Sequence, residues 1–345
     1  GSSVAIDGDY AVIGVPNDTD KGTDSGSVYI YYRDGSSWKR QEKIVASDGE
    51  ASDQFGKSVS INGDYIVIGA WFANSYKGEV YIYKRNGVNW EYKTTLSNND
   101  STMNFFGYSV DISGNYLVIG AYGDGTNLHG SAFVYKRDDD LETWSQQTKL
   151  TADVLTNEER FGFAVSIYND FIFVGALSDD NGTDSGSVFV FKRIPSSREE
   201  PETWSQIQQI IPAGNSTSHR FGYSVAISGE YAVVGAIGEG NGVVYIFKST
   251  GATWTQQAKI VASDPAVGDQ FGNSLGISGD YVIIGASQKD ASTGSVYIFK
   301  RTGTTWTQVE KIQASDAAVS DGFGTSVAIS GSTAVVGAPT GDADP

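Results

Sequence analysis

The chain has 345 residues, and its 24 lysines and arginines against 41 aspartates and glutamates give a formal net charge of −17. An acidic chain repels a phosphate backbone, and this one has no cysteine, so the composition argues against nucleic acid as a partner and excludes disulfides and thiolate metal sites. The 42 glycines and the 12% of aromatic residues predict many short strands joined by tight turns.

A strand-like segment that opens with Phe-Gly recurs about every 50 to 60 residues along the chain. Residues 1–6 match this segment without its Phe, so it occurs seven times, and the six phenylalanines are Phe55, Phe106, Phe161, Phe221, Phe271 and Phe323. A second segment, Tyr-x-Val-x-Gly-Ala or a close variant, follows each copy after a tight turn. Such a turn needs a residue at positive φ, which we expect of Gly8, Gly63, Gly114, Gly229, Gly279 and Gly331, and of Asn169 in the fourth repeat.

A third and a fourth segment complete the unit in six of the seven repeats. The third is apolar on both faces, as in residues 244–247, whereas the fourth begins at a Trp and alternates, as in residues 254–260. Strands that are apolar on both faces belong to sheets covered on both sides, and repeated four-stranded sheets achieve this by stacking around an axis. The sequence therefore predicts an all-β, seven-bladed β-propeller of four-stranded antiparallel blades with an incomplete last blade. Six blades plus an extra hairpin is the alternative.

We expect residues 1–345 to form this single propeller domain. Its blades would cover residues 1–54, 55–105, 106–160, 161–220, 221–270 and 271–322, with a partial blade at 323–345. Two outer strands of the last blade are missing from this count, so Val335 and Val336 would lie near an unpaired strand edge. We therefore expect a fragment of a longer protein, in which a missing segment or a neighbouring molecule supplies the two strands.

The paired motifs Phe-Gly at 221–222 with Gly-Ala at 235–236, and Phe-Gly at 323–324 with Gly-Ala-Pro at 337–339, resemble the FG-GAP repeat. This repeat forms the propeller of integrin α-subunits and occurs in large extracellular proteins of microbes and algae. The resemblance implies an extracellular or cell-surface location. Calcium-binding integrin repeats carry an Asp-x-Asp-x-Asp-Gly loop between the first and second strands, but here that connection is too short to wrap an ion. We therefore expect the usual calcium sites of the family to be absent.

Ligand contacts are expected on one side of the ring. The loops between strands two and three, and between strand four and the next blade, are long and differ between repeats, and function tends to lie on variable loops of a rigid scaffold. We call the side that carries these 2–3 and 4–1 loops the loop face; the integrin resemblance implies ligand binding there too. Trp71, Phe72, Tyr76 and Tyr122 fall in 2–3 loops and are the candidate contacts for a sugar or a protein. The alternative is that they close the channel mouth or cover a blade edge.

Two acidic 2–3 loops are candidate cation sites, with the residues Asp18, Asp20 and Asp24 in one and Asp179, Asp180 and Asp184 in the other. Their spacing is typical of calcium ligands, while the alternative is a solvated turn. No cofactor is required by the fold, and calcium in these loops is the one candidate. Four sequons, at Asn17, Asn99, Asn181 and Asn215, would carry glycans in a secreted eukaryotic protein.

Catalytic motifs are not evident in the sequence. His129 and His219 lie in different repeats, and no spacing singles out a carboxylate pair, although such a pair would serve glycoside chemistry. No stretch approaches the roughly 20 apolar residues of a membrane helix. We predict a non-enzymatic extracellular recognition or adhesion module that binds a protein or glycan. The alternatives are a structural building block of an extracellular filament or coat, packed against copies or other domains, and a carbohydrate-active propeller enzyme.

Overall fold

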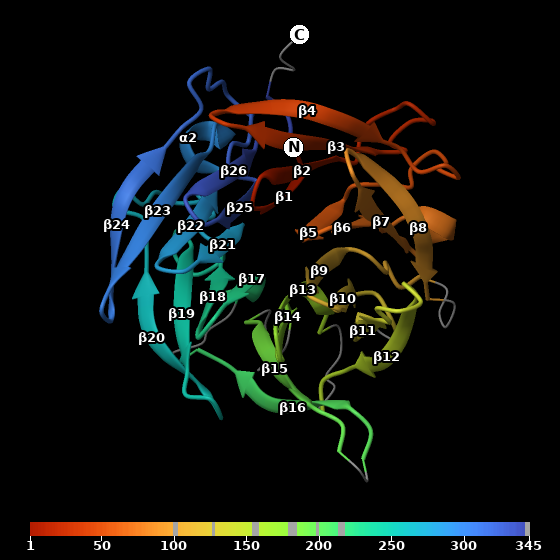
Figure 1. Cartoon of the computed structure of the whole chain (residues 1–345). Helices are drawn as coiled ribbons and strands as arrows, with labels where there is room; N and C mark the ends of the chain where they lie inside the picture. Colours follow the sequence, from red (N-terminus) through yellow and green to blue (C-terminus); the bar gives the residue numbers. More distant parts are fainter. Residues whose placement is uncertain are drawn as a thin grey trace.

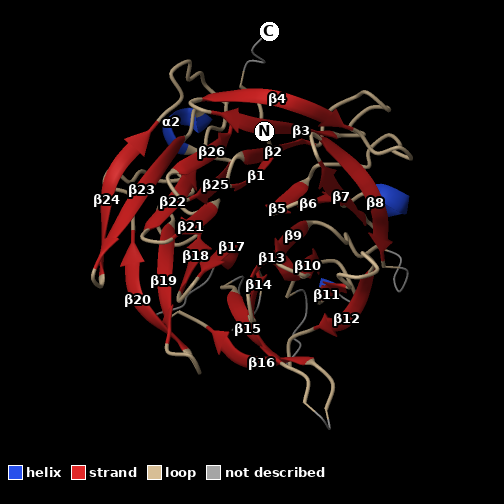
Figure 2. Ribbon diagram, viewed as in Figure 1, coloured by secondary structure: helices blue, strands red, loops and turns tan. Residues whose placement is uncertain are grey.

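The computed structural model describes residues 1–98, 103–125, 128–153, 159–178, 185–197, 200–212 and 218–341. Its strands form six four-stranded antiparallel sheets and one two-stranded sheet, set around a central axis (Figure 1). Strands dominate the regular structure, as Figure 2 shows. Two four-residue turns, α1 (Ala73–Tyr76) and α2 (Lys289–Ser292), are marked as helices, but their central residues have left-handed backbone. Within the described residues, no helix is long and apolar enough to cross a bilayer.

Each blade is a meander that starts next to the axis and ends at the rim. The first blade holds β1 (Ser3–Asp7), β2 (Tyr10–Val15), β3 (Ser27–Asp34) and β4 (Ser37–Ile44). The second holds β5 (Ser58–Asn62), β6 (Tyr65–Ala70), β7 (Glu79–Asn86) and β8 (Asn89–Ser97). The third holds β9 (Ser109–Ser113), β10 (Tyr116–Ala121), β11 (Ser131–Arg137) and β12 (Trp144–Leu150). The fourth holds β13 (Phe161–Tyr168), β14 (Phe171–Ala176), β15 (Ser187–Ile194) and β16 (Thr203–Ile210). The fifth holds β17 (Phe221–Ser228), β18 (Tyr231–Ala236), β19 (Val243–Ser249) and β20 (Trp254–Ile260). The sixth holds β21 (Leu275–Ser278), β22 (Tyr281–Ala286), β23 (Ser295–Thr302) and β24 (Thr305–Ile312).

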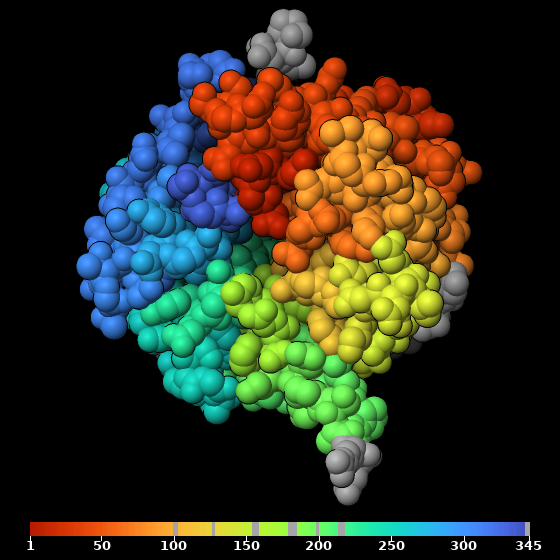
Figure 3. Space-filling view, in the orientation of Figure 1, coloured from red at the N-terminus to blue at the C-terminus, as the bar shows by residue number. Residues whose placement is uncertain are grey.

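The number of blades differs from the prediction. After the sixth blade the described residues supply only β25 (Ser326–Ser330) and β26 (Thr333–Gly337), which form a two-stranded hairpin. The prediction of a seven-bladed propeller is therefore wrong: the structure has six four-stranded blades plus an extra hairpin. This hairpin packs against β21 of the sixth blade and β1 of the first. In Figure 3 it lies, in dark blue, between the red first blade and the blue sixth blade.

The turns between the first and second strands have the predicted conformation. Gly63 and Gly279 have φ values of 58° and 57°, and the other predicted turn glycines are also positive. Asn169, which replaces Gly in the fourth repeat, has a φ of 52°. The prediction that each of these turns needs a residue tolerant of left-handed backbone is therefore confirmed.

Both motif glycines are required by contact between neighbouring blades. A Cβ added to Gly69, at the end of the second strand, would collide with the carbonyl oxygen of Gly107 in the Phe-Gly of the next blade. The same contact joins Gly14, Gly120, Gly175, Gly235 and Gly285 to Gly56, Gly162, Gly222, Gly272 and Gly324, respectively. Gly337 meets Gly1 in the same way, so the hairpin packs on the first blade with the geometry of an ordinary blade contact.

Aromatic pairs also join each of the first five blades to the next. Tyr65 of the second blade packs edge-to-face on Trp144 of the third, with 6.1 Å between ring centroids, and the Arg137 guanidinium lies 4.1 Å from the centre of the Tyr65 ring. Equivalent ring pairs are Tyr10–Trp90, Tyr116–Trp204, Phe171–Trp254 and Tyr231–Trp306. At the hairpin Thr333 takes the place of the Tyr, and the Arg33 guanidinium donates a 3.1 Å hydrogen bond to its hydroxyl. The repeated Trp residues thus serve inter-blade packing.

Candidate functional site

The 2–3 and 4–1 loops meet on one side of the ring, as the topology requires. The backbone N–H of Phe55, at the end of a 4–1 loop, donates a 3.0 Å hydrogen bond to the Ser25 carbonyl in the preceding 2–3 loop. Isolated bridges between Gly130 and Phe161 and between Gly294 and Phe323 repeat this arrangement. The loop face is therefore anchored at the Phe-Gly that opens each inner strand.

The four aromatic candidates gather in one cluster on the loop face. Trp71 and Phe72 follow β6, and their rings stack with centroids 3.8 Å apart. Tyr76 contacts Phe72 edge-to-face at 5.0 Å, and Tyr122, which follows β10, lies 6.4 Å from Trp71. The Trp71 orientation is fixed because its Nε1–H donates a 2.7 Å hydrogen bond to Gln54. The structure thus brings together candidate residues from two blades.

Four further rings, which the sequence analysis did not select, extend this cluster. Phe105 stacks on Tyr122 at 5.0 Å, and Tyr108 lies 4.7 Å from Tyr122 and 5.1 Å from Trp71. Phe163 follows at 5.0 Å from Tyr108, and Tyr223 at 5.3 Å from Phe163. We call the eight residues the aromatic arc: Trp71, Phe72, Tyr76, Phe105, Tyr108, Tyr122, Phe163 and Tyr223. All are half-buried except Tyr76, which is 49% exposed.

Three of the four additional rings occupy the same position of the repeat. Tyr108, Phe163 and Tyr223 each stand directly after a Phe-Gly, and the same position holds Lys57 in the second repeat. In the other repeats this position holds the small polar residues Ser2, Asn273 and Thr325. Phe105 stands directly before a Phe-Gly, where the backbone has a φ of 54°. An alignment of the repeats on Phe-Gly would have revealed both positions.

Three cations accompany the aromatic arc. The Lys57 ammonium lies 5.3 Å from the centre of the Trp71 ring and 5.1 Å from that of Tyr108, and burial lowers the pKa of Lys57. Arg160 is half-buried and its Nε has no hydrogen-bond partner among the described residues, while Arg220 is exposed. Burial raises the pKa of the Tyr108 hydroxyl above its ordinary value. The arc therefore combines neutral phenol rings with cationic groups.

The described acidic loop holds a lysine between its carboxylates. The Lys43 ammonium lies 2.9 Å from an Asp18 oxygen and 2.7 Å from an Asp20 oxygen. Asp24 has a φ of 55°, and its carbonyl accepts a 3.0 Å hydrogen bond from the Gln54 N–H. In the part of the chain that the structure describes, no three acidic or histidine side chains are grouped to hold a metal. Calcium binding here stays a prediction.

Several predicted residues lie outside the described part of the chain: Asp179, Asp180, Asp184, Asn99, Asn181 and Asn215. Asn17, the remaining sequon residue, is exposed in a turn after β2. His219 lies with its Nδ1 3.8 Å from a Glu239 oxygen, in a blade other than that of His129. The structure describes these two histidines in separate surroundings.

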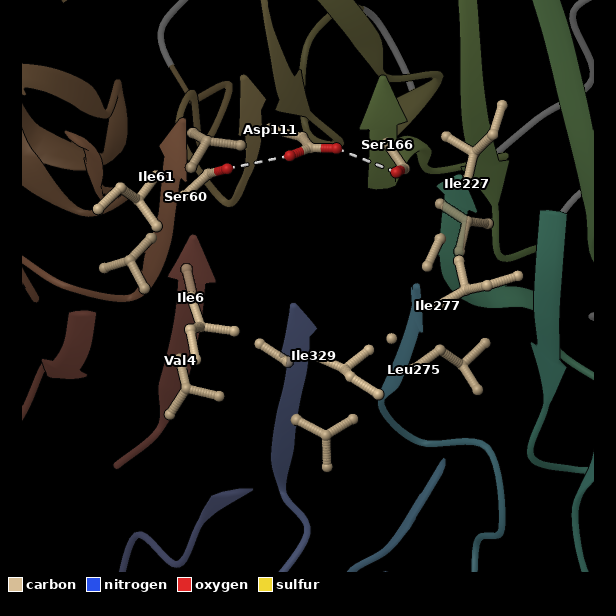
Figure 4. A pocket seen from close by; sticks show the side chains of 18 of the residues that line it. Val4, Ile6, Ser60, Ile61, Asp111, Ser166, Ile227, Leu275, Ile277 and Ile329 are labelled. Atoms are coloured by element: carbon tan, nitrogen blue, oxygen red, sulfur yellow. Dashed lines mark hydrogen bonds between the residues drawn. The ribbon is translucent and has the colours of Figure 1, made fainter. Parts of the chain in front are cut away.

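A single carboxylate marks the central channel, where the inner strands leave a cavity of about 240 Å³. The middle residue of each inner strand is small, except for Asp111 of β9; the others are Ala5, Ser60, Ser166, Ala226, Gly276 and Ala328. Figure 4 shows Asp111 between Ser60 and Ser166, whose hydroxyls donate hydrogen bonds of 2.9 and 3.0 Å. The Ile112 and Ile167 N–H groups add hydrogen bonds of 3.0 and 2.8 Å. Burial raises the pKa of Asp111.

Through these hydrogen bonds Asp111 of the third blade connects the inner strands of the second and fourth blades. A carboxylate accepts about four hydrogen bonds, and all four positions of Asp111 are used within the protein. The Asp111 carboxylate is thus held by groups of three neighbouring inner strands. The channel therefore contains a structural carboxylate, and the aromatic arc is the better candidate for a functional site.

Comparison with known proteins agrees with this architecture. The FG-GAP repeat family matches residues 1–31, 38–83, 90–135, 144–191, 204–247, 254–299 and 306–345. Integrin alpha-6 of Gallus gallus is 36% identical over 109 residues, which cover 29% of this chain and 10% of that protein. The periplasmic gluconolactonase PpgL of Pseudomonas aeruginosa aligns with a TM-score of 0.59 and 15% identity, covering 90% of this chain and 85% of that one. The chain spans about a tenth of the integrin's length, and the lactonase shares the fold. Because the family matches nearly every blade, this chain belongs to the FG-GAP repeat family.

Proposed function

We propose that this propeller is a non-enzymatic, extracellular recognition or adhesion module that binds a protein or glycan through the aromatic arc. One observation carries the proposal: eight aromatic side chains from several blades form a continuous group on the loop face. The repeated phenylalanines of Phe-Gly show the contrast, since Phe55, Phe106, Phe161 and Phe221 are fully buried. The rings of the arc, in contrast, are only half-buried, with Tyr76 49% exposed, and a partly exposed cluster of apolar side chains is typical of an interaction site.

The arc also has the physical properties of a binding surface. Its rings restrain one another, as the 3.8 Å stack of Trp71 on Phe72 and the 5.0 Å stack of Phe105 on Tyr122 show. A ligand would therefore lose little free energy in ordering these side chains, which favours affinity. Phenol and indole groups present both an apolar face and a hydrogen-bonding edge. Family membership and the similarity to integrin alpha-6 support an extracellular or cell-surface location.

An array of glycans and extracellular proteins, probed with the fluorescently labelled chain with and without calcium, tests the proposal. Tyr76→Ala and Tyr108→Ala should weaken binding to the strongest partner at least about fivefold, as for a central aromatic contact. Tyr92→Ala is the matched control, since Tyr92 on the outer strand β8 is 52% exposed and Tyr76 is 49% exposed. Equal binding by all three variants would place the ligand elsewhere and reject the proposal.

A second function, as a building block of an extracellular assembly, is favoured by a different observation. Among the described strands, β26 pairs only with β25, so its other edge is open. An apolar cavity of about 330 Å³ borders that edge and is lined by Tyr31, Trp38 and Val336, among others. Open edges pair with strands of other chains. Light scattering after size exclusion should then show concentration-dependent assembly that Val335→Lys abolishes; a monomer at every concentration would contradict this function.

A further inference from the structure

The loop face divides into two unlike sectors. In blades two to five, the positions on either side of Phe-Gly hold aromatic or cationic side chains, Gln54 excepted: Lys57, Phe105, Tyr108, Arg160, Phe163, Arg220 and Tyr223. Around the rest of the ring the same positions hold Gln270, Asn273, Gly322, Thr325 and Ser2. Lys57, Arg160 and Arg220 take part in none of the ion pairs found among the described residues. Three cations that form no ion pair within the described residues, concentrated in one sector of a chain with a net charge of −17, need an explanation.

Lys57 makes the arc unsuitable for a cationic ligand. Its ammonium already lies over the faces of Trp71 and Tyr108, at 5.3 and 5.1 Å from the ring centres. These are the faces that a ligand cation would use, and a second positive charge would be repelled. Lys57 is half-buried, which weakens its hydration without supplying a counter-ion. An anion from a ligand would supply the missing partner.

Arg160 presents a second, independent site for an anion. Its side chain interacts electrostatically with Tyr108 and Tyr122, so it shares one ring, Tyr108, with Lys57. Its Nε is buried without a hydrogen-bond partner among the described residues, although the side chain as a whole is half-buried. The guanidinium fork matches a carboxylate in shape and charge. Arg220 continues this row next to Tyr223, in the following blade.

Two acidic residues near the arc are already engaged. Asp53 accepts a 2.7 Å hydrogen bond from the Glu50 N–H, and Asp124 forms a 2.6 Å ion pair with Lys149. The net charge of the whole chain repels an anion only weakly at the arc, because the Debye length is about 8 Å at physiological ionic strength. The local cations therefore decide which charge the arc accepts.

We propose that the ligand of the loop face is an anionic glycan whose sugar carboxylates pair with Lys57 and Arg160 while its rings stack on the aromatic arc. This inference rests on the proposed function of the loop face as a binding site. A glycan is favoured over an acidic peptide because Tyr108, Phe163 and Tyr223 follow one another at 5.0 and 5.3 Å. These tilted rings form a row of aromatic contacts that suits the apolar sides of successive sugar rings, whereas a peptide would need backbone hydrogen-bonding groups that this row does not offer.

The test compares carboxylated, sulfated and neutral glycans with oligoglutamate on one array, followed by titration of the strongest glycan and of its methyl ester. Carboxylated glycans should dominate, and methyl esterification, which removes only the charge, should weaken binding about tenfold or more. Lys57→Gln and Arg160→Gln should each weaken binding of the acid about tenfold but leave binding of the ester unchanged. Lys300→Gln is the matched control, because Lys300 lies 5.3 Å over Tyr281 outside the arc.

The outcomes separate this inference from the proposed function. Equal binding of acid and ester, with sensitivity to Tyr76→Ala, would overturn the anionic ligand but keep the loop face as the site. Preference for oligoglutamate would overturn the glycan, and preference for sulfated glycans would overturn the carboxylate. Absence of binding to every arrayed glycan would overturn the inference outright. Melting curves show whether each variant is folded. Lys57→Gln removes a partly desolvated charge, so it should not lower the melting temperature Tm.

Discussion

This fold needs glycine for two reasons, left-handed backbone in turns and close contact between blades, and two glycines of the second blade represent one reason each. Gly63, in the β5–β6 turn, has a φ of 58° and no atom within 4 Å of an added Cβ. Gly63→Ala therefore costs only the left-handed backbone, about 1 kcal/mol. Gly69 is outside the left-handed region, but an added Cβ would collide with the Gly107 carbonyl oxygen and the Ser58 hydroxyl. Since relief requires two blades to move apart, we expect Gly69→Ala to cost about 3 kcal/mol.

Differential scanning calorimetry can resolve the two costs. An unfolding entropy of about 2.1 cal/mol/K per residue, applied to 345 residues, means that 1 kcal/mol lowers Tm by about 1.4 °C. We expect a fall of about 1 to 2 °C for Gly63→Ala and of about 4 °C for Gly69→Ala. Gly63→Asn is the control and should cost less than Gly63→Ala, because Asn169 occupies the equivalent turn at a φ of 52°. An equal or larger fall at Gly63 would refute the assignment of Gly69 to the blade interface.

Three further predictions concern carboxylates. Burial disfavours the charged form of Asp18, but hydrogen bonds from Lys43 and Ser27 lower its pKa below 3.8. The charged Asp18 thus stabilises the folded state fully above pH 3.8, and this stabilisation is lost as the pH falls through the folded-state pKa. Lys43→Met should therefore make the free energy of unfolding, measured in urea, less dependent on pH in the acid range. An unchanged pH dependence would contradict the ion pair. Because Lys43 already pairs with Asp18 and Asp20, calcium added after chelation should raise Tm only in the Lys43→Met variant. A rise of Tm in the wild-type chain would instead support the calcium site. The pKa of Asp111 should shift the other way, because burial raises it: the midpoint of its ¹³C carboxyl shift should lie above that of an ordinary aspartate, whereas a lower midpoint would show that its four hydrogen bonds outweigh burial.

The strand content of this fold was predictable because its causes are local. Tight turns need a residue at positive φ, and the structure has positive φ at Gly63 and Gly279 and at Asn169, which replaces Gly in the fourth repeat. Strands apolar on both faces require cover on both sides, which indicated stacked blades. The number of blades was not predictable in the same way. A repeat of Phe-Gly indicates an inner strand, as at Phe323, but it does not ensure that two outer strands follow, and here they form no part of the described structure.

The candidate site was predictable only in part, because contact across blades depends on tertiary structure. Trp71 and Tyr122 were selected as isolated loop residues, and only the fold shows that they belong to one cluster. Tyr108 and Phe163 were not among the predicted contacts, although they occupy one repeat position directly after Phe-Gly. Asp111 could have been found by comparing the middle residues of the inner strands, where it is the only charged residue. Its role as a bridge between blades, however, required the positions of Ser60 and Ser166.

The same arrangement explains how this scaffold separates stability from recognition. At five of the six Phe-Gly pairs the Phe is buried, Phe323 being the partly exposed exception, and each Gly is fixed by the approach of the neighbouring blade, so neither can vary without cost. The side chains on either side are less constrained: the preceding residue has left-handed backbone but is not packed in the core, and the following one lies at the loop-face end of the inner strand. These free positions lie next to one another around the ring, so substitutions there change the chemistry of the face without disturbing the core. Variation between Lys57, Tyr108, Phe163 and Asn273 at one repeat position is therefore the expected mark of a surface shaped for a ligand.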